Sequence, residues 1–147
     1  MPRDDRHVIY WDASAILSTL FTDIHSDEAQ NWSHREKGIH LISTLAYAEI
    51  CAVIARMQRE RILADILKKA AVEALERGPW RRLNTWPEWN IIQPLSAKWP
   101  LRGADLWHLA TAKSLQGQLP ELLFLSFDTR LNAAAMGEGM LTRNTFD

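Results

Sequence analysis

Short apolar runs alternate with longer segments of helical periodicity along this chain of 147 residues. Val8–Trp11 and residues 122–127 consist mainly of β-branched, aromatic and other apolar side chains, which is typical of buried strands. Residues 62–77 repeat apolar side chains along one helix face. Parallel strands need a crossover, usually a helix, so this alternation predicts an α/β fold with a central parallel sheet.

The same patterns predict the remaining elements. Further strands are expected at residues 39–42, Trp80–Leu83 and 140–141, and further helices at residues 13–21, 26–37, 45–59, 106–116 and 131–136. The Trp- and Pro-rich residues 84–101 are harder to assign. Thr85 and Glu88 match a capping box at the start of a helix, which Pro94 is expected to kink or end.

Composition limits the possible functions. The net charge is −1, from 17 basic and 18 acidic side chains, so a broadly basic nucleic-acid-binding protein is not indicated. No apolar run approaches the roughly 18 residues that suggest a membrane span. The single Cys51 cannot form an intrachain disulfide and is expected in the core. With no signal-peptide pattern, these features favour a cytoplasmic protein.

Four acidic residues occupy comparable positions in the predicted elements. Asp12 and Asp128 end strands, while Glu49 and Asp105 lie in the first turns of helices. Right-handed strand–helix–strand units would bring such positions to one edge of the sheet. Converging carboxylates repel each other and protonate unless cations lie among them, and Mg²⁺ or Mn²⁺ are the cations that prefer oxygen ligands. The sequence therefore predicts a site able to position phosphates and activate water.

Three of the four acids also have a purely structural explanation. Asp12 could cap the helix that follows it, and Asp105 could favour its own helix through the helix dipole. Glu49 lies among apolar neighbours, where Arg56 two turns later could compensate its charge.

The segments that contain the four acids resemble the motifs of PIN-domain ribonucleases, most closely the toxins of VapBC toxin–antitoxin systems. The matching segments are residues 10–15, 43–49, 101–112 and 125–134, and the resemblance extends from Val8 to Met140. It implies a single PIN-like domain over residues 1–147, with a three-layer α/β/α fold and a parallel sheet of four or five strands. Residues 86–99 and 142–147 depart from the family pattern, which leaves the dimer and antitoxin contacts open.

The resemblance also implies a function. Asp12, Glu49, Asp105 and Asp128 would be the catalytic, metal-binding acids, and Ser14 would support them. The family's activity is RNA cleavage dependent on a divalent metal, Mg²⁺ or Mn²⁺, and its usual form is a homodimer inhibited by a small cognate antitoxin protein. We therefore expect an endoribonuclease that cleaves RNA with metal-activated water, the toxin of a type II toxin–antitoxin pair.

Three further residues near the acids are candidates for supporting roles. His108 lies one turn after Asp105, where it could bind metal, act as a general base or simply pack. Arg102 and Arg130 flank the acids and could meet substrate phosphates or an antitoxin carboxylate, or could be ordinary surface residues.

Two other functions remain open. A metal-dependent phosphatase could use Asp12 as nucleophile, but that chemistry usually needs a second acid two residues later, where this chain has Ser14. A non-catalytic PIN-like module could bind only RNA or a protein. Such a module is expected to have lost an acid, whereas all four are present here.

Overall fold

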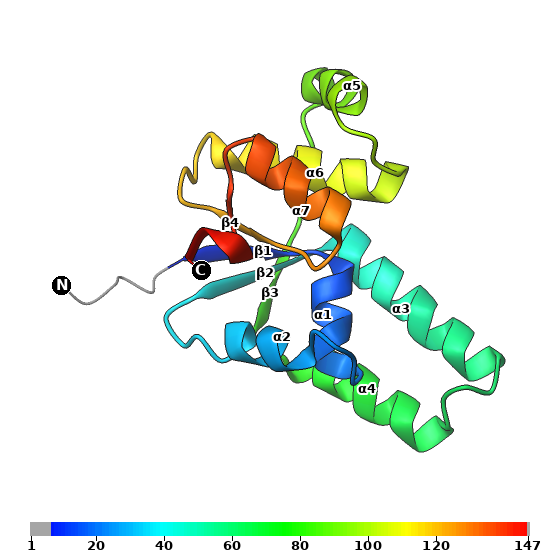
Figure 1. Ribbon diagram of the computed structural model, residues 1–147. Helices are drawn as coiled ribbons and strands as arrows, with labels where there is room; N and C mark the ends of the chain where they lie inside the picture. The colour runs from blue at the N-terminus through cyan, green and yellow to red at the C-terminus, as the bar shows by residue number, and fades with distance from the viewer. Residues whose placement is uncertain (1–6, 147) are drawn as a thin grey trace.

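Five short strands form one parallel sheet in the computed structural model, which describes residues 7–146 (Figure 1). The spatial order of the strands is β3-β2-β1-β4-β5, with β1 at the centre. Their bounds are β1 Val8–Trp11, β2 Ile39–Ser43, β3 Trp80–Leu83, β4 Leu123–Leu125 and β5 Leu141–Thr142. The predicted fold class is confirmed, and residues 1–6 and 147 of the predicted domain lie outside the described residues.

Helices cover both faces of the sheet (Figure 1). One layer contains α1 Ala13–Leu20, α2 Ser26–Ser33, α3 Thr44–Arg59 and α4 Asp65–Arg77. The other contains α5 Trp89–Lys98, α6 Gly103–Gln116 and α7 Thr129–Gly137, and a short 3₁₀ helix, Arg143–Phe146, follows β5. In the part of the chain that the structure describes, none of the helices is long and apolar enough to cross a membrane.

Strand β1 contributes to a separate core on each side of the sheet. Ile9 and Trp11 pack into the core beneath α1 to α4, whereas Tyr10 packs with α6 and α7 and stacks on Phe124 at 5.4 Å between ring centroids. All four side chains are fully buried. Successive side chains of a strand point to opposite faces, so burial on both faces explains why β1 is continuously apolar.

Two helix boundaries differ from the prediction because the backbone turns there. Helix α2 ends at Ser33 rather than at residue 37, and the chain then turns back with the Gly38 N–H donating to the Arg35 carbonyl at 3.0 Å. Helix α4 begins at Asp65 rather than at residue 62. The preceding residues close α3 instead: Arg61 has a φ of 57°, and the Ile62 N–H donates to the Met57 carbonyl at 2.9 Å.

The prediction for residues 84–101 is wrong at the start of the helix. No capping box forms, because α5 begins at Trp89 without a side-chain cap. Of the two effects expected of Pro94, it does not end α5, which continues to Lys98. Proline has no backbone N–H, so Pro94 cannot donate the usual helix hydrogen bond to the carbonyl of Asn90. Asn90 is exposed, and water can donate to its carbonyl instead.

The prediction that Cys51 is a core residue is also wrong, because its side chain is exposed. Helix α3 buries Ala46, Ile50 and Ile54, which recur every four residues along one face. Cys51 follows Ile50 directly and is therefore rotated about 100° away from that face.

The left-handed conformation of Arg61 gives a stability prediction. Replacing Arg61 with Gly should raise the free energy of unfolding by up to about 1 kcal/mol, because a side chain at positive φ is strained. Gly139→Ala should lower it by about 1 kcal/mol, since Gly139 has a φ of 81° and its surroundings are open. Urea unfolding of both variants measures the difference, and equal effects of the same sign would contradict this account.

Candidate active site

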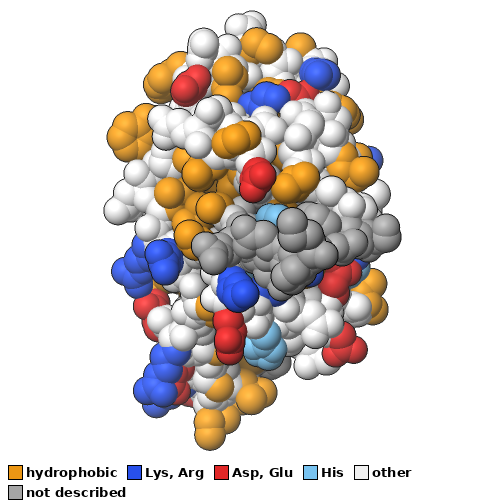
Figure 2. Space-filling model, turned by 90° about the vertical axis from the view of Figure 1, so that its left-hand side faces the viewer, with side chains coloured by type: hydrophobic (Ala, Val, Ile, Leu, Met, Phe, Trp, Pro, Cys, Tyr) orange, Lys and Arg blue, Asp and Glu red, His pale blue; other side chains and the backbone are white. Residues whose placement is uncertain are grey.

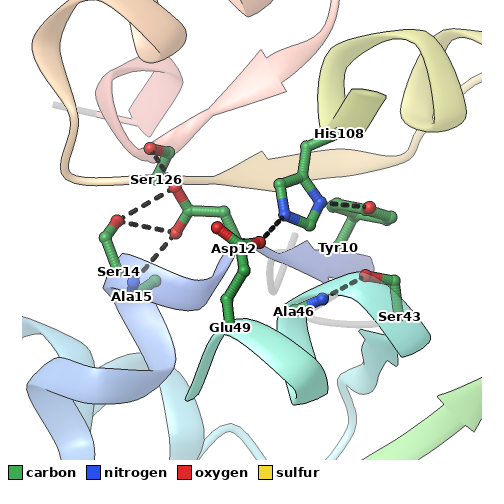
Figure 3. Close-up of polar contacts among 9 residues, drawn as sticks. All are labelled: Tyr10, Asp12, Ser14, Ala15, Ser43, Ala46, Glu49, His108 and Ser126. Carbon is green, nitrogen blue, oxygen red and sulfur yellow. Dashed lines mark hydrogen bonds and ion pairs between the residues drawn. The ribbon is translucent and has the colours of Figure 1, made fainter. Parts of the chain in front are cut away.

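Asp12 follows β1 directly, and its carboxylate is enclosed by hydrogen-bond donors (Figure 3). Oδ1 accepts from the Ala15 N–H at 2.8 Å, and the Ser14 hydroxyl lies within 2.9 Å of both carboxylate oxygens. The Ser126 hydroxyl donates to Oδ2 at 2.6 Å. Burial raises the pKa of Asp12, and these hydrogen bonds oppose that rise. Asp12 therefore caps α1, as the structural explanation required, and also lies at the predicted edge of the sheet.

Ser126 is a contact that the sequence analysis missed. It is fully buried and follows β4, which ends at Leu125 rather than at residue 127. Its hydroxyl donates to Asp12 and accepts from the Asp128 N–H at 3.1 Å. A single polar residue inside the apolar run 122–127 was the signal that could have identified it. Ser14 contacts Asp12, as its predicted supporting role requires.

Glu49 lies in the second turn of α3 and pairs with His108 of α6 (Figure 3). The distance from Glu49 Oε1 to His108 Nε2 is 2.7 Å, and His108 Nδ1 lies 2.7 Å from the Tyr10 hydroxyl. His108 is only 1% exposed. Glu49 is therefore partnered by His108, which packs in the core and contacts an acid at the same time.

Asp105 and Asp128 line one cavity of about 470 Å³. Asp105 lies in the first turn of α6, and Asp128 caps α7 by accepting from the Leu131 N–H at 2.9 Å. Asp128 does not end the strand as predicted, but lies in the connection between β4 and α7. Arg102 and Arg130 line the same cavity, so both flanking arginines lie next to acids.

The acids influence one another electrostatically. Partial burial raises the pKa of Asp105, and the nearby charges of Asp128 and Glu49 raise it further, while His108 and Arg102 oppose the shift. Burial also raises the pKa of Tyr10, with smaller contributions from Asp12 and Glu49. Asp105 therefore lies near Asp128 and Glu49, and Tyr10 lies near Asp12 and Glu49, at the carboxyl edge of the sheet.

The carboxylates do not form a closed cage. Among residues 7–146, no three His, Cys, Asp or Glu side chains are close enough together, as they stand, to hold a metal ion. Asp105 and Asp128 share the cavity, Glu49 is turned toward His108, and Asp12 is enclosed by its donors. The structure thus brings the acids to one edge, and their role as metal ligands stays a prediction.

The family model of the PIN domain matches residues 9–136, a range that extends from β1 into α7 and includes all four acids. This chain belongs to the PIN-domain family. The family resemblance of the sequence motifs is confirmed. A comparison with curated protein sequences found no match.

Three solved structures have the same fold as this PIN domain. PAE2754 from Pyrobaculum aerophilum is 17% identical with a TM-score of 0.61, covering 96% of this chain and 87% of its own. VapBC-1 from nontypeable Haemophilus influenzae is 13% identical with a TM-score of 0.62, and the match covers 95% of this chain and 99% of the VapBC-1 chain. FitAcB from Neisseria gonorrhoeae is 18% identical with a TM-score of 0.61, and the match covers 95% of this chain and 99% of the FitAcB chain. At these identities the similarity concerns the fold.

The raised pKa of Asp105 gives a prediction about stability and pH. A carboxyl group whose pKa is higher in the folded state binds its proton more tightly there, so it destabilises the fold as pH rises above its ordinary value. Asp105→Asn should therefore raise the melting temperature at pH 7 without divalent cations. The gain should shrink as pH falls, because the native carboxyl group then becomes neutral too.

Asp65→Asn is the matched control for this experiment. Asp65 is exposed in the first turn of α4 and accepts a hydrogen bond from Gln58 at 2.6 Å. Its neutralisation should lower the melting temperature slightly at pH 7, because a favourable helix-dipole interaction is lost. Thermal unfolding between pH 4 and pH 8, followed by circular dichroism, measures both effects; a lower melting temperature for Asp105→Asn at pH 7 would contradict the repulsion between the acids.

Proposed function

We propose that this PIN domain is a cytoplasmic, divalent-metal-dependent endoribonuclease and the toxin of a type II toxin–antitoxin pair. The observation that carries the proposal is the group of four acids at the carboxyl edge of the sheet, where Asp128 and Glu49 both raise the pKa of Asp105. Repulsion between acids in a partly open site is typical of residues kept for chemistry rather than for stability.

The donor set suits Mg²⁺ or Mn²⁺. Asp105 and Asp128 would hold the ion from the cavity, Glu49 would complete its coordination, and Asp12 would do so directly or through water. When bound, such an ion supplies an activated water and neutralises charge on the phosphodiester. The hydroxyl groups of Ser14 and Ser126 hold the Asp12 carboxylate in one orientation, and these hydrogen bonds do not depend on a bound ion.

The cavity also offers partners for an RNA phosphate. Arg102 and Arg130 are exposed residues that line it beside the acids, and a guanidinium group can donate two hydrogen bonds to one phosphate. Figure 2 shows the amino-terminal side of the sheet, where basic side chains are interspersed with acidic ones on the described surface. The cavity, rather than a broad basic face, is therefore the proposed place of RNA binding.

The two alternative functions fit the observations less well. A phosphatase would need Asp12 as an accessible nucleophile, but Asp12 is only 3% exposed and both of its oxygens accept hydrogen bonds. A non-catalytic binding module gives no reason for Asp105 to lie beside Asp128 and Glu49, whose charges raise its pKa.

Cleavage activity is the main prediction of this proposal. The protein should cleave structured RNA in Mn²⁺ or Mg²⁺ and lose this activity in EDTA. Asp12→Asn and Asp105→Asn should each lower the rate more than roughly 100-fold, which is the upper range for residues that only orient a metal ligand. Initial rates on a panel of labelled structured RNAs measure the effect.

Glu121→Gln is the matched control for the cleavage assay. Glu121 is an exposed acid shortly before β4, and therefore lies at the opposite edge of the sheet. This variant should keep the native rate. Equal loss in all variants, or full activity of Asp105→Asn with Mn²⁺, would count against a metal-dependent nuclease.

We also propose that the protein is a homodimer. Exposed apolar side chains occur on α4, with Ile66 76% and Leu67 56% exposed, and around the start of α5, with Trp86 72% and Trp89 87% exposed. Exposed apolar patches often mark interfaces. Light scattering at micromolar concentration tests this point, and a monomer would contradict it.

A small antitoxin protein is the proposed regulatory partner. The sequence motifs of this chain resemble those of VapBC toxins. VapBC-1, a solved structure with the same fold, has the name of these toxin–antitoxin systems. An antitoxin that places an Arg in the cavity could pair with Asp105 or Asp128 and so exclude both metal and RNA. Asp12 is too enclosed to be its first contact.

Co-expression gives the test of this partner. The protein, expressed with the product of the small reading frame beside its gene, should co-purify with it and should no longer arrest growth. Asp105→Asn alone should also be non-toxic. If the neighbouring product neither co-purifies nor suppresses growth arrest, the protein is a free-standing ribonuclease rather than a toxin with an antitoxin.

A further inference from the structure

His108 connects three elements at the acidic edge of the sheet. It is 1% exposed, and it lies between Tyr10 of β1 and Glu49 of α3 (Figure 3). Both ring nitrogens are occupied, Nδ1 at 2.7 Å from the Tyr10 hydroxyl and Nε2 at 2.7 Å from Glu49 Oε1. With both nitrogens occupied in this way, His108 is a poor candidate for a metal ligand.

The chemistry of Glu49 fixes one proton position in this network. A carboxylate only accepts hydrogen bonds, so Nε2 of His108 carries the hydrogen that faces Glu49. The ring is therefore held between the Tyr10 hydroxyl and Glu49, with its Nε2–H directed at the carboxylate.

A second buried histidine shows what a purely structural version of this network looks like. His40 is 3% exposed and accepts from Trp11 Nε1 through Nδ1 at 2.9 Å. Its Nε2 lies 3.2 Å from the backbone carbonyl of Arg35. A backbone carbonyl is enough to satisfy a buried histidine. The carboxylate of Glu49, whose side chain is 32% exposed, is thus not required for the burial of His108.

We propose that His108 is a positioning residue that holds Oε1 of Glu49 and leaves Oε2 available to a divalent cation near Asp105. This inference rests on the proposed function, because it concerns the same cation. A glutamate loses considerable rotamer freedom when it is held in place. The bonds from Tyr10 and His108 impose that order before the cation arrives, which strengthens binding.

Cation binding by the full-length protein tests the proposal. Isothermal titration calorimetry with MnCl₂ should show that His108→Leu weakens Mn²⁺ binding roughly 10- to 100-fold. His108→Gln should restore most of the affinity, because its amide N–H can replace Nε2–H. The control His40→Leu should lower the melting temperature and leave Mn²⁺ affinity unchanged.

A spectroscopic measurement covers the case in which His108→Leu does not fold. In ¹⁵N-labelled protein without metal, the His108 ring should carry a hydrogen on Nε2, and Glu49→Gln should shift the Nε2 signal. Tyr10→Phe, which removes only a hydroxyl group, should weaken Mn²⁺ binding less than His108→Leu. An Nε2 without a hydrogen would overturn the proposal, as would native Mn²⁺ affinity in both His108→Leu and Tyr10→Phe.

The outcomes separate this inference from the proposed function. If the native protein binds Mn²⁺ and Asp105→Asn weakens it, while His108→Leu has no effect, only the positioning role fails. If the native protein binds no divalent cation at all, the proposed function and this inference fail together.

Discussion

The buried carboxylate of Asp12 is the interaction on which the carboxyl edge of the sheet depends. Burying a charged group is costly unless hydrogen bonds compensate it. Here the donors come from the first turn of α1 and from Ser126, which is 114 residues away in sequence. The Asp12 N–H also donates to the Leu125 carbonyl at 3.1 Å. These bonds can form together only when β1, α1 and the end of β4 meet in one arrangement.

That arrangement fixes where the other acids lie. Helix α3 begins directly after β2, and Asp128 caps the helix that follows β4, so Glu49 and Asp128 come to the same edge as Asp12. Helix α6 adds Asp105 from the opposite layer. Partial burial, together with the charges of Asp128 and Glu49, raises the pKa of Asp105 and costs stability. A fold under selection for stability alone would place neutral side chains here, which is why the edge is interpreted as a functional site.

Local sequence patterns predicted the order of the elements and the positions of the acids. They could not predict contacts between distant residues or the turns of the backbone. All five strands were anticipated, β1, β2 and β4 from short apolar runs and β3 and β5 as edge strands, although β5 is shifted by one residue. The start of α4 was missed because Arg61 adopts a left-handed conformation that a non-glycine residue rarely adopts. Ser126 and Tyr10 were missed as partners in the site because their contacts join residues 114 and 98 positions apart.

The two aromatic–histidine pairs of β1 show how one local device can serve two purposes. Trp11 and Tyr10 point to opposite faces of the sheet, and each reaches the Nδ1 of a buried histidine. On the side of α1 to α4, the other ring nitrogen of His40 contacts the backbone carbonyl of Arg35, which only satisfies its hydrogen bonding. On the side of α6, the other ring nitrogen of His108 contacts Glu49, a carboxylate that raises the pKa of Asp105. The same strand that anchors the core therefore also connects that core to the charges at its edge.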